Sequence, residues 1–254
     1  MALGRMRRAL DTLILMAGLL LAWQAVFVLF GDLAITPPVE TFAQALHMLG
    51  SERFRPDLIE TAQAFAAALA IAVFAGLSLG LVLGFHRLSG EVFEPILSAL
   101  YSIPKVTLYP MILLIFGIGV GAKIAFGTIH GIVPIVVFTM DAVRNIRPVY
   151  VKTGRVYHLG AMSMARTILI PAVLPEIFTG LRVGFSLTLI GTLIGEMFGA
   201  LHGVGFVLMR AIGLHDVKTI MAITLLLVVF AAGVNTLLLA IDRRLHHRAA
   251  TAGM

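Results

Sequence analysis

The sequence predicts an all-α polytopic membrane protein with six transmembrane helices in a compact bundle. Of the 254 residues, 59% are hydrophobic and only 13% are charged, whereas a soluble domain carries about 25% charged residues. Several long stretches have few or no charges, and each approaches the roughly 20 residues that a helix needs to cross a bilayer. These stretches lack the alternation of barrel strands. Composition therefore excludes a soluble enzyme, a coiled coil and a disordered chain.

The charge-free stretches place the six predicted spans in order along the chain. The third is short, and we expect Pro110 to kink it. Only Gly117, Gly119 and Gly121 separate the third span from the fourth, which predicts a tight hairpin. The predicted spans lie near residues 12–30, 59–85, 104–119, 123–140, 174–198 and 219–241.

The distribution of lysine and arginine predicts the orientation of the chain. With the N-terminus in the cytoplasm, thirteen Lys and Arg residues fall in inside segments and five in outside segments. Because inside loops are enriched in positive charge, both termini are predicted to be cytoplasmic. The net charge of +6 is therefore attributed to orientation and not to nucleic-acid binding.

The chain divides into three predicted regions. Residues 1–57 hold a tail, the first span and an outer loop, residues 58–243 form a core of five spans, and residues 244–254 form a cytoplasmic tail. Two glycine stripes at four-residue spacing, 76–84 and 191–199, let helix backbones approach closely. These stripes predict a compact bundle and, without a second domain, a homodimer.

The longest inside connection, residues 141–175, is predicted to be a helix–glycine–helix elbow. Residues 151–159 form its first helix, and Gly160 stands where a C-cap needs a left-handed residue. Ser163 is expected to cap the second helix, and Pro171 to end it.

Pro175 then falls in the first turn of the fifth span. An elbow fixed to two spans is a mechanical lever. The alternative is an amphipathic linker that lies on the bilayer.

The sequence contains no recognisable catalytic, cofactor or metal site. Cysteine is absent, which excludes disulfides, thiolate metal sites and cysteine nucleophiles. Residues 117–123 superficially resemble a phosphate-binding loop but lack its register and are followed by isoleucine.

Three polar residues inside the predicted spans are candidates for a passage or gate, because ionisable groups in a membrane are costly. Arg182 lies about two turns into the fifth span and could line the passage, pair across helices or extend to the surface as an anchor. Glu196 lies near the outer end of the same helix. His130 lies at mid-depth in the fourth span, where a neutral histidine bonded to a neighbouring helix is the alternative.

Residues 160–161 and 170–182 resemble the cytoplasmic coupling loop of ABC-importer permeases, most closely the branch that serves nitrate, sulfonate, taurine and bicarbonate uptake. The resemblance extends over roughly residues 58–243. It is supported by similar motifs at residues 102–105, 116–119, 195–199 and 203–206.

Two features depart from the family pattern. Gly154, Arg155 and Val156 occupy the place of the family's Glu-Ala-Ala box, and the distance from Gly160 to Pro171 is about two residues short. By resemblance, the ATPase-coupling residues are Gly154, Arg155, Val156, Gly160, Ala161, Ser163, Pro171 and Pro175.

The resemblance implies a transport subunit of a bacterial inner membrane that hydrolyses nothing itself. It implies a second copy of the chain, two cytoplasmic ATPase subunits and an extracytoplasmic solute-binding protein as partners. A heterodimer with a paralogue stays open, as does the substrate, with a small anion expected from the branch. The alternative functions are an ATP-independent secondary transporter and an intramembrane enzyme.

Overall fold

The computed structural model describes residues 2–31 and 34–251, and for residues 2–9, 161 and 244–251 it describes the backbone alone. Every regular element in this described part is helical, which confirms the all-α fold class. The chain forms two compact units, one of residues up to 57 with 207–230, the other of 58–206 with 231 onward.

The first unit contains α1 (Ala2–Phe30), α2 (Pro38–Gly50), most of α10 (Val204–Gly213) and the first part of α11 (Val217–Thr251). The α1 span is entirely unburied over its most apolar window, as expected of a helix that contacts lipid. The Trp23 indole N–H donates to the Thr36 carbonyl at 3.0 Å. This bond joins α1 to the segment that precedes α2.

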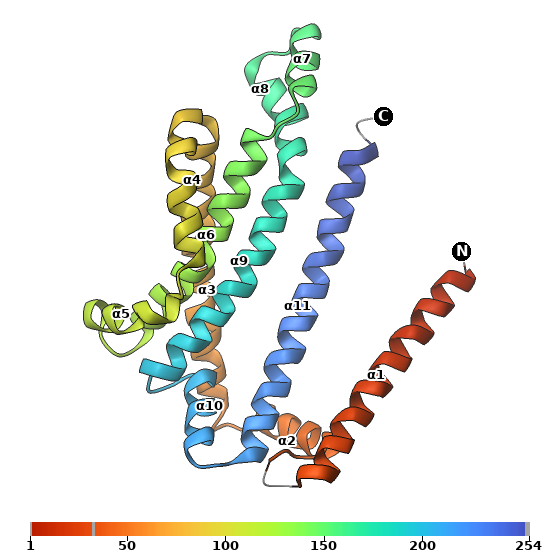
Figure 1. Cartoon of the computed structure of the whole chain (residues 1–254), viewed down its shortest axis with the longest axis vertical. Helices are drawn as coiled ribbons and strands as arrows, with labels where there is room; N and C mark the ends of the chain where they lie inside the picture. The colour runs from red at the N-terminus through yellow and green to blue at the C-terminus, as the bar shows by residue number, and fades with distance from the viewer. Residues whose placement is uncertain (1, 32–33, 252–254) are drawn as a thin grey trace. The chain divides into compact units, whose positions relative to one another are not determined.

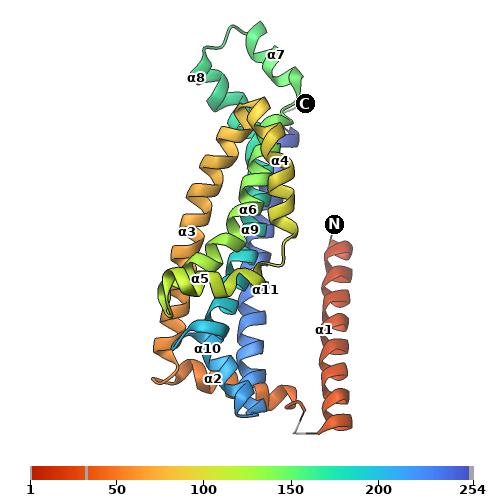
Figure 2. The ribbon, with the colours of Figure 1, turned by 60° about the vertical axis from the view of Figure 1, so that its left-hand side comes forward.

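The second unit is organised around α6 (Val120–Arg144), which lies beside α9 (Ile170–Gly199) in both views of the ribbon (Figures 1 and 2). A Cβ added at Gly184 of α9 would lie 2.5 Å from Ile135 of α6. On α3 (Arg55–Phe85), a Cβ at Gly80 would lie 2.6 Å from Thr139 of the same α6.

The 76–84 stripe therefore packs against α6 inside one chain, as do Gly191 and Gly195, whereas Gly199 packs against Tyr109 and Leu113. This packing is what the prediction of a compact bundle requires. Since this packing already occupies them, the stripes give no support to a homodimer. The homodimer therefore stays a prediction.

The third predicted span is broken, whereas a kinked helix over 104–119 was expected. Helix α4 (Arg87–Ser102) ends before Pro104, and a 3₁₀ turn, η1 (Lys105–Leu108), leads into α5 (Tyr109–Phe116) at a bend of 88°. Pro110 stands in the first turn of α5, where it needs no N–H partner, so it kinks nothing. The break falls at Pro104 because proline disfavours helix in the residue before it.

The hairpin between the third and fourth spans is confirmed. Gly117 and Gly119 adopt φ values of +72° and +137°, which glycine reaches without steric cost. In the described part of the chain, five helices are long and apolar enough to cross a membrane, or six if the bent pair of α4 and α5 counts as one span. The third predicted span corresponds to this bent pair, which begins at Arg87 and so earlier in the chain than the expected 104–119.

Candidate functional site

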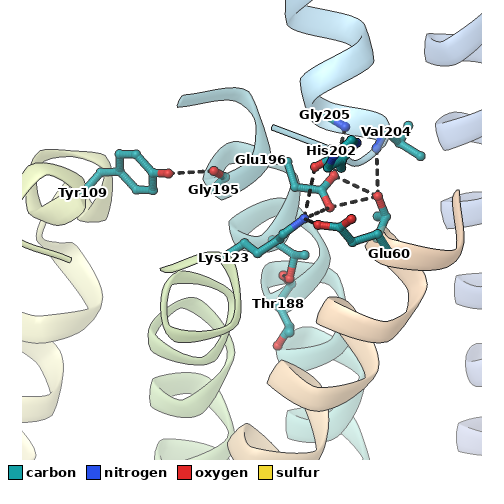
Figure 3. A network of polar contacts seen from close by, with 11 residues as sticks. Glu60, Tyr109, Lys123, Thr188, Gly195, Glu196, His202, Val204 and Gly205 are labelled. Carbon is teal, nitrogen blue, oxygen red and sulfur yellow. Dashed lines mark hydrogen bonds and ion pairs between the residues drawn. The ribbon is translucent and has the colours of Figure 1, made fainter. Parts of the chain in front are cut away.

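A buried ionic cluster joins α3, α6 and α9 where α6 begins and α9 ends (Figure 3). Lys123, in the first turn of α6, and Glu196, in the last turn of α9, both have fully buried side chains. The Lys123 Nζ lies 2.7 Å from Glu60 Oε1 and 3.4 Å from Glu196 Oε1. Glu60 comes from the second turn of α3, so one ammonium connects three helices.

The cluster also holds the start of α10. Glu196 Oε2 accepts the Gly205 N–H at 2.9 Å, and the Thr61 hydroxyl accepts the Val204 N–H at 2.8 Å while it donates to the Glu196 carboxylate at 2.9 Å. A carboxylate at a helix N-terminus satisfies free N–H groups and complements the helix dipole.

The connection before α10 follows the same cluster. Lys123 Nζ donates to the His202 carbonyl at 3.1 Å. Gly203 adopts φ +117°, and a Cβ there would collide with the Glu196 carboxylate. We call residues Glu60, Thr61, Lys123 and Glu196 with the 202–205 backbone the α10 clamp. The arrangement fixes backbone and neutralises buried charge, and it presents no nucleophile.

The expected elbow is present between α6 and α9. It consists of α7 (Pro148–Val156), α8 (Ala161–Met164) and a π-helical turn, η2 (Ala165–Leu169), which runs without interruption into α9. The elbow lies beyond one end of the α6–α9 pair in Figure 1. Residues 145–147 separate α6 from α7, whereas the second arm of the elbow is continuous with α9.

The cap of α7 differs from the prediction. The left-handed residue is His158, with φ +50°, and Gly160 does not adopt a left-handed backbone. The His158 N–H bonds to Arg155 O and the Leu159 N–H to Gly154 O, both at 3.0 Å, which is a Schellman motif. The predicted kind of cap is correct, but α7 ends three residues earlier than expected, at Val156.

The second arm of the elbow also differs. Ser163 lies inside α8 and caps nothing, and its carbonyl accepts the Thr167 hydroxyl at 2.6 Å. Pro171 begins α9 instead of ending a separate helix, and Pro175 is buried inside α9. The π-helical turn lets the chain continue through this region, which is why no break occurs.

Gly154 packs against the second arm of the elbow. It is buried, and a Cβ there would lie 2.6 Å from Met164 Cε and 3.3 Å from Ile168 Cδ1. A Cβ on Gly160 would meet nothing within 4 Å. Arg155 and Val156 are exposed, whereas the side chain of Ala161 lies outside the described ones.

The structure places the three candidates for a passage or gate apart from one another. Arg182 Nη1 lies 3.5 Å from Asp242 Oδ2 of α11, so the cross-helix pairing considered for it is present. Glu196 belongs to the α10 clamp. The His130 Nδ1 lies 2.9 Å from the Phe126 carbonyl of its own helix, whereas a neighbouring helix was expected.

Sequence reasoning missed Lys123, Glu60 and Thr61, because charges at the ends of spans were used only as boundaries. A signal was available. Glu60, Lys123 and Glu196 all lie at the same predicted side of the membrane, and opposite charges there favour a shared site.

The model of one protein family, described as binding-protein-dependent transport system inner membrane component, matches residues 72–251. The chain belongs to this family. It is therefore an inner-membrane permease subunit of an ABC importer and not an enzyme. Membership implies binding-protein and ATPase partners.

Relatives and solved structures agree with this assignment. The permease is 26% identical to the nitrate import permease protein NrtB of Leptolyngbya laminosa, over 81% of this chain and 76% of that protein. It is 24% identical to the taurine transport system permease protein TauC of Escherichia coli, over 91% and 86%. These relatives confirm the suspected branch.

The fold is similar to that of a chain of the MetNI methionine ABC transporter in inward facing conformations. The TM-score is 0.65 at 19% identity, covering 77% of this chain and 99% of that one. This likeness supports the fold alone.

Proposed function

We propose that two copies of this permease form a passage for a small anion with an oxyanion group, such as nitrate or a sulfonate. A binding protein delivers the anion from outside, and two ATPase subunits drive its transfer to the cytoplasm. The substrate class is supported by the nitrate and taurine permeases among the relatives, since taurine is itself a sulfonate.

The observation that carries the coupling part of the proposal is the elbow. Its two arms are held together by Gly154 against Met164, while Val156 and Tyr157 at the turn are 75% and 73% exposed. Exposed apolar side chains on a rigid turn are the kind of surface that a partner protein covers. We propose that the ATPase docks on residues 155–158 and that its movement is transmitted through η2 to α9.

A substitution at the turn tests this docking. Val156→Asp places a charge in the proposed contact, so the permease should reach the membrane yet lose most co-purifying ATPase. The matched control is Val39→Asp on α2, because Val39 is 80% exposed and lies far from the elbow in sequence. Equal recovery of ATPase with both variants would contradict docking at this turn.

The orientation and the pairing of copies are also part of the proposal. Both termini and the elbow face the cytoplasm, which is supported by the excess of Lys and Arg in those segments.

A further inference from the structure

The break between α4 and α5 interrupts a pair of apolar helices that forms either one broken span or a re-entrant loop. Helices α4 and α5 are long and apolar enough for a membrane span only when they are counted together. They bend by 88° at residues 103–104. Irregular backbone at membrane depth is tolerated where it is covered by protein or faces water. Residues 101–104, 106 and 107 are exposed in the single chain. This segment therefore faces either another subunit or an aqueous passage.

Lys105 follows the break directly. Its Nζ donates to the Tyr101 carbonyl at 3.2 Å and lies 5.4 Å from the centre of the Tyr101 ring. Within the described part of the chain, no carboxylate lies within ion-pair distance of this ammonium. An ammonium has three N–H donors, so Lys105 retains the capacity to bind a further acceptor.

The other basic groups inside the spans behave differently. Lys123 is neutralised by Glu60 and Glu196, and Arg182 lies beside Asp242. An uncompensated ammonium within a membrane span is energetically costly. Within the described part of the chain, Lys123 and Arg182 thus have carboxylate partners, whereas Lys105 has none.

The hydroxyls beside Lys105 do not replace it as donors. Ser102 Oγ donates to the Ser98 and Ala99 carbonyls, and Thr107 Oγ1 donates to the Pro104 carbonyl at 2.8 Å. Among residues 101–107, Lys105 is therefore the charged donor at the break.

We propose that Lys105 is an anion contact within the transport passage, at the break between α4 and α5. It attracts an oxyanion into the apolar span and lowers the electrostatic barrier to its transfer. This inference rests on the proposed function, because it requires that the transported solute carry negative charge.

Cysteine chemistry tests the site without knowledge of the substrate, because the chain contains no native cysteine. The full transporter carrying Thr107→Cys is treated with a methanethiosulfonate reagent that is either anionic (sulfonatoethyl) or cationic (trimethylammonioethyl). The rate at which the thiol reacts is then compared between this variant and the same variant with Lys105→Gln added. Lys105 should speed the anionic reagent by about fivefold and slow the cationic one. The matched control is Leu114→Cys, which is 87% exposed on α5 and should not respond to Lys105.

Equal reaction rates at Thr107→Cys with and without Lys105→Gln would overturn the proposal, and so would failure of this thiol to react from either side. These outcomes do not depend on which anion is transported.

Uptake separates this inference from the proposed function. Lys105→Gln and Lys105→Cys should take up labelled nitrate or ethanesulfonate about tenfold more slowly, with binding-protein-stimulated ATP hydrolysis retained. Aminoethylation of Lys105→Cys should restore uptake, because it returns the ammonium. Wild-type uptake by Lys105→Gln would overturn the contact and leave the proposed function intact. No uptake of anions by the wild type would refute the substrate class and, with it, the anion contact, even if Lys105 still alters the reagent rates.

Discussion

Lys123 is the residue on which the α10 clamp depends, because its side chain is fully buried and its ammonium contacts two carboxylates. Removal of one partner from a buried ion pair leaves an uncompensated charge, which costs about 3–5 kcal/mol. We expect Lys123→Met to lower the stability of the purified permease by that amount, measured by denaturant titration in detergent.

An exposed pair serves as the control for Lys123→Met. Lys218 and Glu40 lie 3.6 Å apart with side chains 66% and 56% exposed, and such pairs contribute about 0.2–1 kcal/mol. Lys218→Met should therefore change little. Adding Glu196→Gln to Lys123→Met should recover part of the loss, and a purely additive double variant would contradict the clamp.

His158 tests the cap of α7 at the same scale. Its φ of +50° is strained for a residue with a Cβ, whereas glycine adopts this conformation freely. We expect His158→Gly to stabilise the end of α7 by about 1 kcal/mol, so that the Leu159 amide, bonded to Gly154, exchanges about fivefold more slowly. The same substitution at Tyr157, where φ is −82°, should not slow this exchange.

At the scale of elements, the elbow transmits force only if its two arms stay packed. Gly154→Val would push into Met164 and Ile168, whereas Gly160→Val has open space and an unstrained backbone. We therefore predict that Gly154→Val uncouples ATP hydrolysis from transport and that Gly160→Val retains most coupling. Simultaneous assays of ATPase rate and uptake in proteoliposomes measure this difference, and the reverse ranking would refute the role given to Gly154.

The elements that could be predicted from sequence are those with a strong periodic or compositional signal. The six apolar spans, the Gly117–Gly119 hairpin and the elbow all follow from local residue patterns. The break at Pro104 was not predicted because the hydropathy of the chain stays high across it. The π-helical turn was not predicted because no residue pattern there indicates that backbone geometry. The α10 clamp depends on contacts between residues up to 143 positions apart, which one sequence does not reveal.

At the scale of the whole molecule, the proposed orientation has a direct test. Reporter fusions at residue 254 and near residue 1 should be active in the cytoplasm, and an insertion at Glu52 should be active outside. The reason is the excess of positive charge in the segments assigned to the cytoplasm. A cytoplasmic reporter at Glu52 would reverse the assignment of every connection.

The central claim is that this permease carries a small oxyanion by a cycle driven by partner ATPases. The most direct measurement is uptake of labelled nitrate and ethanesulfonate by proteoliposomes that contain the permease, its ATPase and its binding protein. The account predicts uptake that requires all three proteins and ATP, and that stops with Val156→Asp. Uptake of an anion by the permease alone, without ATP or the ATPase, would contradict it.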